Sequence, residues 1–285
     1  MKEGIKRIFK KITTNNFGWK ILKPLARLGN FLFLSRQIYL EKNITFEETS
    51  LVVNVLTDKF ELITQEGPFK GLIYPSMKSV GSSLYPKLIG SYEKELWPII
   101  NEFKANQYMD IIDIGSAEGY YAVGLARIFK KAKIIAYDIN NEARELCQEM
   151  AIKNQVGDRL KIYSYCSSEV LAKFNFQERG LIICDCEGFE KELFSKENIN
   201  NLKGCDLIIE THDFIDINIS SKIKELFKNT HDLISIKSID DIEKAHTYNF
   251  KVLENFSLED KLLYLSEYRP AIMEWVICKS KMKNI

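Results

Sequence analysis

Pairs of polar side chains with acid–base character follow two apolar runs in the second half of the chain. Asp185 and Glu187 are two residues apart, and so are Glu210 and His212. Residues two apart in an extended strand lie on the same face of a sheet. Neutral imidazole is available as a proton acceptor near pH 7, and a carboxylate can take the same part. We therefore expect His212 to act as a general base, with Asp185 as the second candidate.

The carboxylates of this group have a second chemical use. Asp185, Glu187 and Glu210 offer oxygen ligands, which suit Mg²⁺ or Ca²⁺ better than zinc. They could also contact the substrate directly. A divalent cation such as Mg²⁺ is therefore an alternative occupant, although the sequence alone assigns no metal. A structural alternative also stays open, in which Glu187 and Glu190 cap or decorate the next helix and His212 is a loop residue.

A glycine-containing turn follows an earlier apolar run, 111–114, and leads into a helical pattern. Gly115 and Gly119 let the backbone turn tightly and approach a ligand closely. Loops in this position of a doubly wound sheet bind nucleotide-like cofactors. A tight strand-to-helix turn without a ligand is the plain alternative. We expect the cofactor-binding residues of this turn to be Asp113, Gly115, Ser116, Glu118, Gly119 and Tyr120.

A second carboxylate narrows the choice of cofactor. Asp138 ends the apolar run 134–137, lies 25 residues after Asp113, and can accept both ribose hydroxyls of an adenosine. NAD enzymes share this feature, but a dinucleotide loop has the pattern G-x-G-x-x-G, which is absent here. Asp113 and Glu118 also place negative charge where a pyrophosphate would lie. S-adenosylmethionine carries a sulfonium and an ammonium group, so charge complementarity favours it over NAD(P).

At these positions the sequence resembles the class I S-adenosylmethionine-dependent methyltransferases. Residues 113–119 look like their first motif, with Ala117 replacing the glycine often found in the middle of it. Residues 183–190, Ile-Cys-Asp-Cys-Glu-Gly-Phe-Glu, resemble the fourth-strand D-x-E-G-x-E signature of FkbM-type methyltransferases. Residues 207–212 resemble the fifth-strand segment of the same group. The resemblance covers roughly residues 80–280.

This resemblance implies an activity and further site residues. It implies methyl transfer to a hydroxyl group of a sugar-containing acceptor: a surface glycan, a lipid-linked glycan or a glycosylated metabolite. Segments such as 81–93 commonly fold over the donor in this superfamily, so that Tyr92 or Glu93 would hold the amino-acid end of the donor and Lys87 an anionic acceptor. Ser167, after the third strand, joins the expected donor-binding residues. An ordinary surface loop is the alternative for this segment.

Two other classes of function compete with this reading. One is an NAD(P)-dependent Rossmann oxidoreductase, which the missing pyrophosphate loop disfavours. The other is a non-catalytic partner in glycan assembly that retains only the methyltransferase fold. We expect neither of them, and instead predict a methyltransferase of polysaccharide biosynthesis.

The elements that must position these residues are predicted from residue 110 onward, where apolar runs of strand length alternate with helical patterns. Such alternation predicts an α/β fold with a mostly parallel, doubly wound, Rossmann-like sheet of seven strands. In the strand order usual for this fold, 3-2-1-4-5-7-6, the fourth and fifth strands are neighbours. The predicted strands are 111–114, 134–137, 160–164, 181–184, 207–209, 233–236 and 272–278, and the helices are 92–107, 119–130, 141–154, 167–174, 189–200 and 219–229.

Residues 1–94 are predicted to form an N-terminal extension, and residues 95–285 the S-adenosylmethionine-binding methyltransferase domain. The extension would contain amphipathic helices, a β-hairpin within 50–74 and an irregular, lid-like loop over 75–91. Residues 1–36 hold nine basic residues against one acidic residue, a net charge of +8. Two alternatives stay open for them: peripheral binding to an anionic membrane, or packing of their apolar face on the catalytic domain or on a second copy in a homo-oligomer.

Composition excludes several other classes of protein. Across 285 residues, 40 Lys and Arg balance 39 Asp and Glu, whereas nucleic-acid readers usually show a basic excess. We therefore expect no nucleic-acid partner. The six cysteines contain no C-x-x-C pair, and no secretory signal precedes them, which indicates reduced thiols in a cytoplasmic protein.

Overall fold

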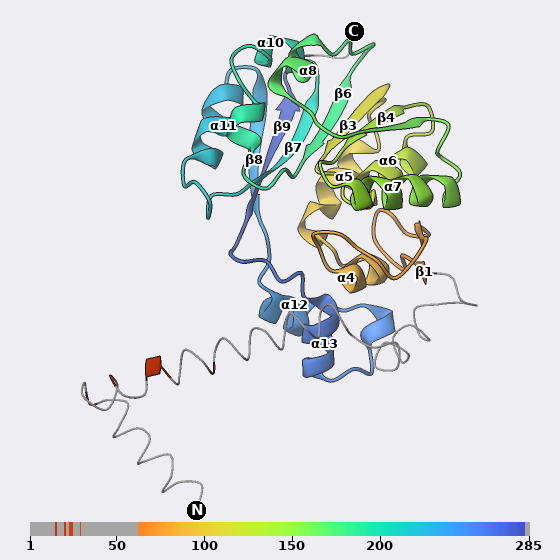
Figure 1. Ribbon diagram of the computed structural model, residues 1–285, viewed down its shortest axis with the longest axis vertical. Helices are drawn as coiled ribbons and strands as arrows, with labels where there is room; N and C mark the ends of the chain where they lie inside the picture. The colour runs from red at the N-terminus through yellow and green to blue at the C-terminus, as the bar shows by residue number, and fades with distance from the viewer. Residues whose placement is uncertain (1–14, 16–19, 21–22, 25–28, 30–61, 283–285) are drawn as a thin grey trace, which may run out of the picture. The chain divides into compact units, whose positions relative to one another are not determined.

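The computed structural model describes residues 62–282 and the single positions 15, 20, 23, 24 and 29 (Figure 1). The chain divides into two compact units, residues 1–54 and 55–285, and the features that follow lie in the second. Apart from those single positions, the predicted helices of residues 1–36 lie outside the described residues. So do residues 50–61 of the predicted β-hairpin. None of the described helices is long and apolar enough to cross a membrane.

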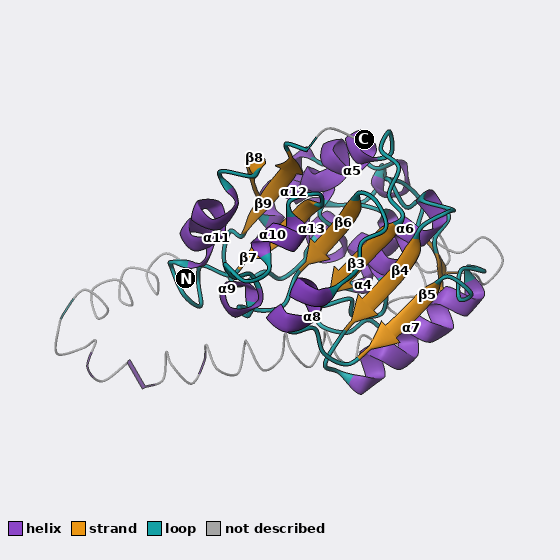
Figure 2. Ribbon diagram, turned by 90° about the horizontal axis from the view of Figure 1, so that it is seen from above, coloured by secondary structure: helices purple, strands orange, loops and turns teal. Residues whose placement is uncertain are grey.

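A seven-stranded sheet forms the centre of the second unit (Figure 2). Its order, β5-β4-β3-β6-β7-β9-β8, is the predicted 3-2-1-4-5-7-6. Among the described strands of this sheet, β9 alone runs antiparallel to its neighbours, so the carboxyl ends of the other six meet at one rim. The strands are β3 (Asp110–Ile114), β4 (Lys133–Tyr137), β5 (Leu160–Tyr163), β6 (Gly180–Cys184), β7 (Asp206–Thr211), β8 (His231–Lys237) and β9 (Glu274–Ser280).

Helices cover both faces of this sheet because its central strands are apolar on both sides. Every residue of β3 and β6 is buried, and each buried Ile or Leu side chain contributes about 1.5–3 kcal/mol. One face carries α5 (Trp97–Phe103), α6 (Tyr120–Ile128) and α7 (Asn141–Lys153) (Figure 2). The other carries α8 (Ser168–Lys173), α9 (Glu190–Leu193), α10 (Ile199–Leu202) and α11 (Ile219–Phe227). The α/β doubly wound prediction is confirmed.

Short elements gather beyond the carboxyl rim of the sheet (Figure 1). The α12–α13 pair is an insertion between β8 and β9 that contacts α4 through α13. Residues 62–94, predicted as part of an N-terminal extension, lie in the same compact unit as the sheet. The elements are β1 (Leu62–Ile63) paired antiparallel with β2 (Ile73–Tyr74), α4 (Leu84–Ile89), the 3₁₀ helices η1 (Lys94–Leu96) and η2 (Lys251–Leu253), α12 (Asp241–Thr247) and α13 (Leu258–Leu265).

One loop prediction and one helix prediction are wrong for local reasons. The segment predicted as an irregular loop contains α4, because Pro86 lies in the first turn, where its missing N–H would be unpaired anyway, and Gly90, at φ 95°, ends the helix. The single helix predicted over 189–200 is broken into α9 and α10. Asn198 accepts a hydrogen bond from the N–H of Ser195 at 3.1 Å, which interrupts the helical backbone.

Candidate active site

A cavity of about 430 Å³ opens at the carboxyl rim of the sheet. Loops that follow β3, β4, β5 and β6 form its walls, and residues 80–82 contribute from the segment before α4. Ligands of open α/β sheets bind at this rim. The predicted site residues that line the cavity are Asp113, Gly115, Ser116, Tyr120, Asp138, Asp185, Glu187 and Lys87.

The turn between β3 and α6 lies against the end of β6. Gly115 has φ 83°, and a Cβ atom built on it would lie 1.6 Å from the carbonyl oxygen of Asp185. The N–H groups of Gly115 and Ser116 both donate to the carbonyl of Tyr137, at 2.9 and 3.0 Å. Ala117 adopts φ 46° in place of the motif's usual glycine. The turn is therefore fixed between β4 and β6, with its backbone facing the cavity.

Asp113 carries a buried carboxylate into the cavity wall. Its side chain is 2% exposed, and its Oδ2, like the Oγ of Ser116, has no hydrogen-bond partner among the described residues. Burial raises the pKa of Asp113 to about 8; the N–H of Ala122 opposes this rise, while Asp185, Asp138 and Glu93 add to it. Buried polar atoms are normally paired. These two atoms without partners, Asp113 Oδ2 and Ser116 Oγ, fit a polar, cationic ligand.

Asp138 ends β4 at the edge of the cavity, where it is half-buried. Its Oδ2 accepts the N–H of Ala117, and its Oδ1 accepts the N–H of Asn140, both at 2.8 Å. Each carboxylate oxygen has a further lone pair. The carboxylate is thus held in place by backbone donors and still offers acceptors for ligand hydroxyls.

Lys87 and Glu118 form an ion pair, and this corrects the predictions for both. Each residue is 1% exposed, and the Lys87 ammonium contacts the Glu118 carboxylate directly. The ammonium also donates to Ser82 Oγ at 2.6 Å and lies 4.9 Å from the centre of the Tyr92 ring. Glu118 does not line the cavity. The pair fastens α4 and the segment before it to the first turn, and Lys87 has no unpaired charge to offer an anionic acceptor.

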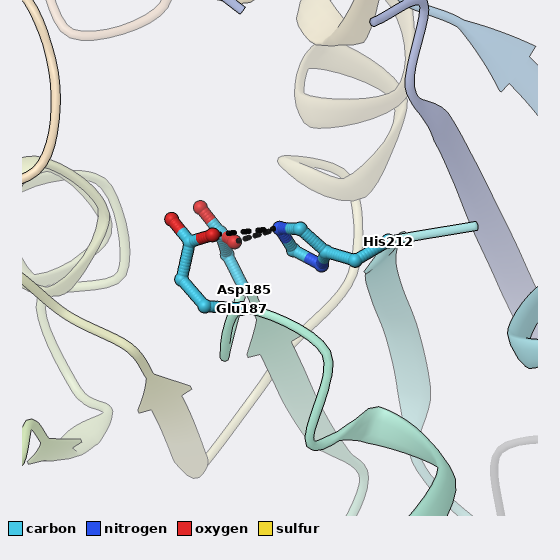
Figure 3. A group of neighbouring side chains, drawn as sticks. All are labelled: Asp185, Glu187 and His212. Atoms are coloured by element: carbon cyan, nitrogen blue, oxygen red, sulfur yellow. Dashed lines mark ion pairs between the residues drawn. The ribbon is translucent and has the colours of Figure 1, made fainter. Parts of the chain in front are cut away.

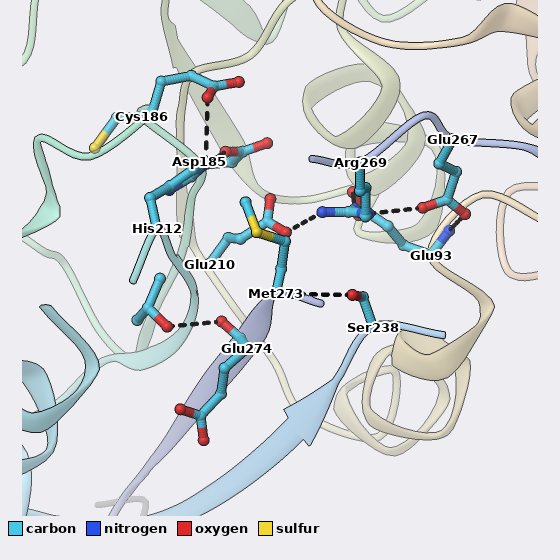
Figure 4. Close-up of polar contacts among 12 residues, drawn as sticks. Glu93, Asp185, Cys186, Glu210, His212, Ser238, Glu267, Arg269, Met273 and Glu274 are labelled. Carbon is cyan, nitrogen blue, oxygen red and sulfur yellow. Dashed lines mark hydrogen bonds and ion pairs between the residues drawn. The ribbon is translucent and has the colours of Figure 1, made fainter. Parts of the chain in front are cut away.

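Glu93 and Glu210 also lie outside the cavity lining, because both pair with Arg269 (Figure 4). Arg269 pairs with Glu267 as well, at 2.9 Å. Burial raises the pKa of Glu93 to about 7, against the opposing effect of Arg269. Arg269 lies between α13 and β9, and no motif in the sequence points to it. The cluster ties the insertion between β8 and β9 to the end of β7.

Gly119 and Ser167 are helix N-caps rather than cavity-lining residues. Gly119, at φ 99°, begins α6, and a Cβ atom there would lie 2.8 Å from Cys147 Sγ. Ser167 begins α8 and accepts the N–H of Val170 at 3.3 Å. Both predicted positions therefore shape the cavity wall through the helices that they start.

His212 faces two carboxylates at the ends of β6 and β7 (Figure 3). Its Nε2 lies 3.4 Å from Asp185 Oδ1 and 3.4 Å from Glu187 Oε2. Burial lowers the pKa of His212, but Glu187, Glu190 and Asp185 together raise it to about 11. The imidazole is then protonated near pH 7. This corrects the prediction that His212 is a neutral imidazole base. Asp185 lines the cavity, and His212 does not.

Glu190, expected from the sequence only as a residue that caps or decorates the next helix, is a partner of His212. It is fully buried, and its Oε1 lies 2.9 Å from His212 Nδ1. The same oxygen accepts the N–H of Gly188 at 3.1 Å and that of Cys186 at 3.3 Å. Its place in the D-x-E-G-x-E signature was the available signal. The last glutamate of the signature orients the imidazole ring.

Comparison with known proteins gives a partial sequence match and several likenesses of fold. No protein-family model matches the chain. Over 52 residues the chain is 42% identical to the release factor glutamine methyltransferase of Thermosynechococcus vestitus, a match that covers only 18% of either protein. A precorrin-6y C5,15-methyltransferase from Geobacter metallireducens has a similar fold at 11% identity, covering 67% of this chain and 88% of its own, with a TM-score of 0.39. An O-methyltransferase family protein from Burkholderia thailandensis is similar at 9% identity, over 70% of this chain and 60% of its own, with a TM-score of 0.37.

Proposed function

We propose that this protein is an S-adenosylmethionine-dependent O-methyltransferase that acts on a hydroxyl group of a sugar-containing acceptor. The observation that carries the proposal is the cavity at the carboxyl rim, with the buried carboxylate of Asp113 in its wall and the carboxylate of Asp138 at its edge. The first complements a positive charge, and the second complements a pair of hydroxyl groups. S-adenosylmethionine carries both features.

The alternative of an NAD(P)-dependent oxidoreductase is not favoured. A dinucleotide needs backbone N–H groups and close glycines around its pyrophosphate. Here the N–H groups of Gly115 and Ser116 are bonded to the carbonyl of Tyr137, and Asp113 adds a carboxyl group instead of a positive charge. The wall of the cavity is therefore poorly suited to a pyrophosphate.

The donor supplies an electrophilic methyl group, so the chain has to align an acceptor oxygen and remove its proton. Aligning two reactants can contribute up to about 7–11 kcal/mol. Asp185 is the group best placed to receive the proton, because its carboxylate follows β6 and lines the cavity. The protonated imidazole of His212 forms an ion pair with that carboxylate at 3.4 Å. Asp185 is thus the proposed proton acceptor, and His212 is a positioning residue.

Two features support a sugar as the acceptor. The D-x-E-G-x-E signature over residues 183–190 resembles that of FkbM-type methyltransferases, whose acceptors are often sugars. Tyr165 and Phe189 both line the cavity, with ring centres 6.0 Å apart, and aromatic rings suit the apolar face of a sugar. Glu187, whose side chain is 74% exposed, can accept hydrogen bonds from sugar hydroxyls. A glycan of surface-polysaccharide assembly is the acceptor class that we propose.

The pH dependence of donor binding tests this assignment. Because the pKa of Asp113 is raised to about 8, the carboxyl group is mostly neutral at pH 6 and must ionise to pair with a cation. We expect the donor affinity of the wild type, relative to that of Asp113→Asn, to rise about tenfold per pH unit below 8 and then level off. Calorimetry of S-adenosylmethionine binding from pH 6 to 9 measures this ratio.

The comparison with Asp113→Asn is needed because the amino group of the donor titrates equally with both proteins. The exposed Asp158→Asn variant is the matched control, and its affinity should follow the wild type at every pH. A ratio of wild type to Asp113→Asn that stays constant with pH would show that Asp113 does not face the donor's charge.

A further inference from the structure

We propose that Asp185, Glu187 and His212 form a binding site for one divalent transition-metal ion of the Mn²⁺ or Zn²⁺ type. This inference goes beyond the proposed function, because ion binding requires neither donor nor acceptor. It also differs from the Mg²⁺ set predicted from the sequence. That set included Glu210, which in the structure pairs with Arg269.

Two of the separations among the three ligand atoms match those around a bound ion, and the third, between the two carboxylate oxygens, is at most 4.8 Å. His212 Nε2 lies 3.4 Å from each carboxylate oxygen, and the three residues converge from the ends of β6 and β7 (Figure 3). Ligand atoms bound at about 2.1 Å are about 3.0 Å apart on an octahedron and about 3.4 Å apart on a tetrahedron. The two distances from Nε2 are therefore those expected between ligand atoms of one ion.

The imidazole is oriented as a metal ligand would be. Glu190 Oε1 lies 2.9 Å from His212 Nδ1 and is itself fixed by the N–H of Gly188 at 3.1 Å. Metal-binding histidines commonly donate their other ring N–H to such a carboxylate, which directs the second nitrogen to the ion. Here that second nitrogen, on a ring that is 1% exposed, faces Asp185 and Glu187.

The contact between His212 and Asp185 is also too long for a hydrogen bond. Asp185 Oδ1 is buried and has no hydrogen-bond partner within the described part of the chain. Its distance of 3.4 Å from Nε2 exceeds the usual N–H···O range of about 2.7–3.2 Å. Buried oxygens without partners are rare in folded proteins, and an ion between these atoms would satisfy it.

The charge and chemistry of the cluster select the kind of ion. Three carboxylates, counting Glu190, surround one imidazole. A divalent cation would take the place of the proton on Nε2, which would leave to solvent, and would offset the excess negative charge of the carboxylates. Imidazole suits Zn²⁺ and its neighbours, whereas carboxylates suit Mn²⁺ as well as Mg²⁺. The neighbouring acidic group of Glu93, Asp185 and Glu210 is different, because Arg269 neutralises it.

Under the proposed function, such an ion would have a direct use. Asp185 and Glu187 line the cavity, so an ion on them would face the acceptor. A bound cation lowers the pKa of a coordinated hydroxyl or water. The acceptor oxygen would then lose its proton more readily, and Asp185 would serve as a ligand as well as a proton acceptor.

Titration of Mn²⁺ into the full-length, metal-stripped protein, without donor or acceptor, tests the site. We expect one ion per chain by calorimetry, and nitrogen coupling from a single imidazole in the pulsed EPR spectrum. Glu187→Gln should weaken binding at least about tenfold; this side chain is 74% exposed, so the variant should fold. His212→Asn should remove the nitrogen coupling.

Glu192→Gln is the matched control, since Glu192 is exposed on α9 near the cluster, and its affinity should equal that of the wild type. Zn²⁺ should displace Mn²⁺, and a hundredfold excess of Mg²⁺ should not. The proposal is overturned if Glu187→Gln binds as tightly as the wild type, if no nitrogen coupling is seen, or if Mg²⁺ displaces Mn²⁺ at equal concentration. Failure of the donor-binding test above would leave these results unaffected, so the two proposals can fail separately.

Discussion

Gly115→Ala is expected to abolish donor binding and to lower the free energy of unfolding by about 3 kcal/mol or more. The new Cβ atom would lie 1.6 Å from the carbonyl oxygen of Asp185, which is backbone and cannot rotate away. The N–H of Asp185 donates to the carbonyl of Ile114 at 2.9 Å, so the two strand ends are fastened together at this point. Overpacking of this kind typically costs about 1–3 kcal/mol, and the left-handed φ of 83° adds strain.

Chemical denaturation and calorimetry measure the two effects of Gly115→Ala. Gly157→Ala is the matched control, because its nearest neighbours would lie 3.8–3.9 Å from the new Cβ atom, at ordinary contact distance. We expect this control to change stability by less than about 1 kcal/mol and to bind the donor normally. Native-like stability and donor affinity in Gly115→Ala would contradict the described contact between the turn and the end of β6.

Asp185→Asn is expected to lower kcat at least about a hundredfold, while the dissociation constant of the donor changes less than about threefold. General-base catalysis contributes about 10²–10⁴-fold, and an amide cannot take a proton from a hydroxyl group. Asp185 lines the cavity at the end of β6, whereas the predicted contacts of the donor lie at the ends of β3 and β4. The change should therefore fall on turnover rather than on donor binding.

Transfer of a radiolabelled methyl group measures this effect, once a panel of sugars, nucleotide sugars and lipid-linked glycans has yielded an acceptor. Asp232→Asn, an exposed position on the edge strand β8, should leave kcat within about twofold of the wild type. If Asp185→Asn keeps most of its turnover, the proton leaves to water and Asp185 has no part in its removal.

The sheet was predictable from sequence because its strands are continuous apolar runs. All seven predicted strands are present, with ends shifted by no more than two residues. The first turn was equally visible, because Gly115 and the acidic ends of two strands mark it locally. The helix α4 was missed because residues 75–91 are rich in Ser, Gly and Pro, which favours a loop, although proline is tolerated in the first turn of a helix. The pair α12–α13 carried no pattern that we recognised.

The partners of the charged residues were not predictable, since they depend on contacts between distant segments. Lys87 and Glu118 were each predicted to bind a ligand, but the fold pairs them with each other, although they are 31 residues apart in the sequence. Glu93 and Arg269 are 176 residues apart, and no local pattern links them. His212 was predicted as a neutral base because its sequence neighbours do not reveal Glu190, 22 residues away. The sequence thus indicates which side chains reach the rim, whereas the fold decides which of them keep an unpaired charge.

Calorimetry of the full-length protein with S-adenosylmethionine, NAD and NADP tests the central claim most directly. We expect S-adenosylmethionine to bind with one molecule per chain, and neither dinucleotide to give measurable heat of binding. Asp138→Ala should weaken donor binding by about 1–3 kcal/mol, the range for lost hydrogen bonds to a charged group. Binding of NAD or NADP without binding of S-adenosylmethionine would contradict the account and would identify the cavity as a dinucleotide site.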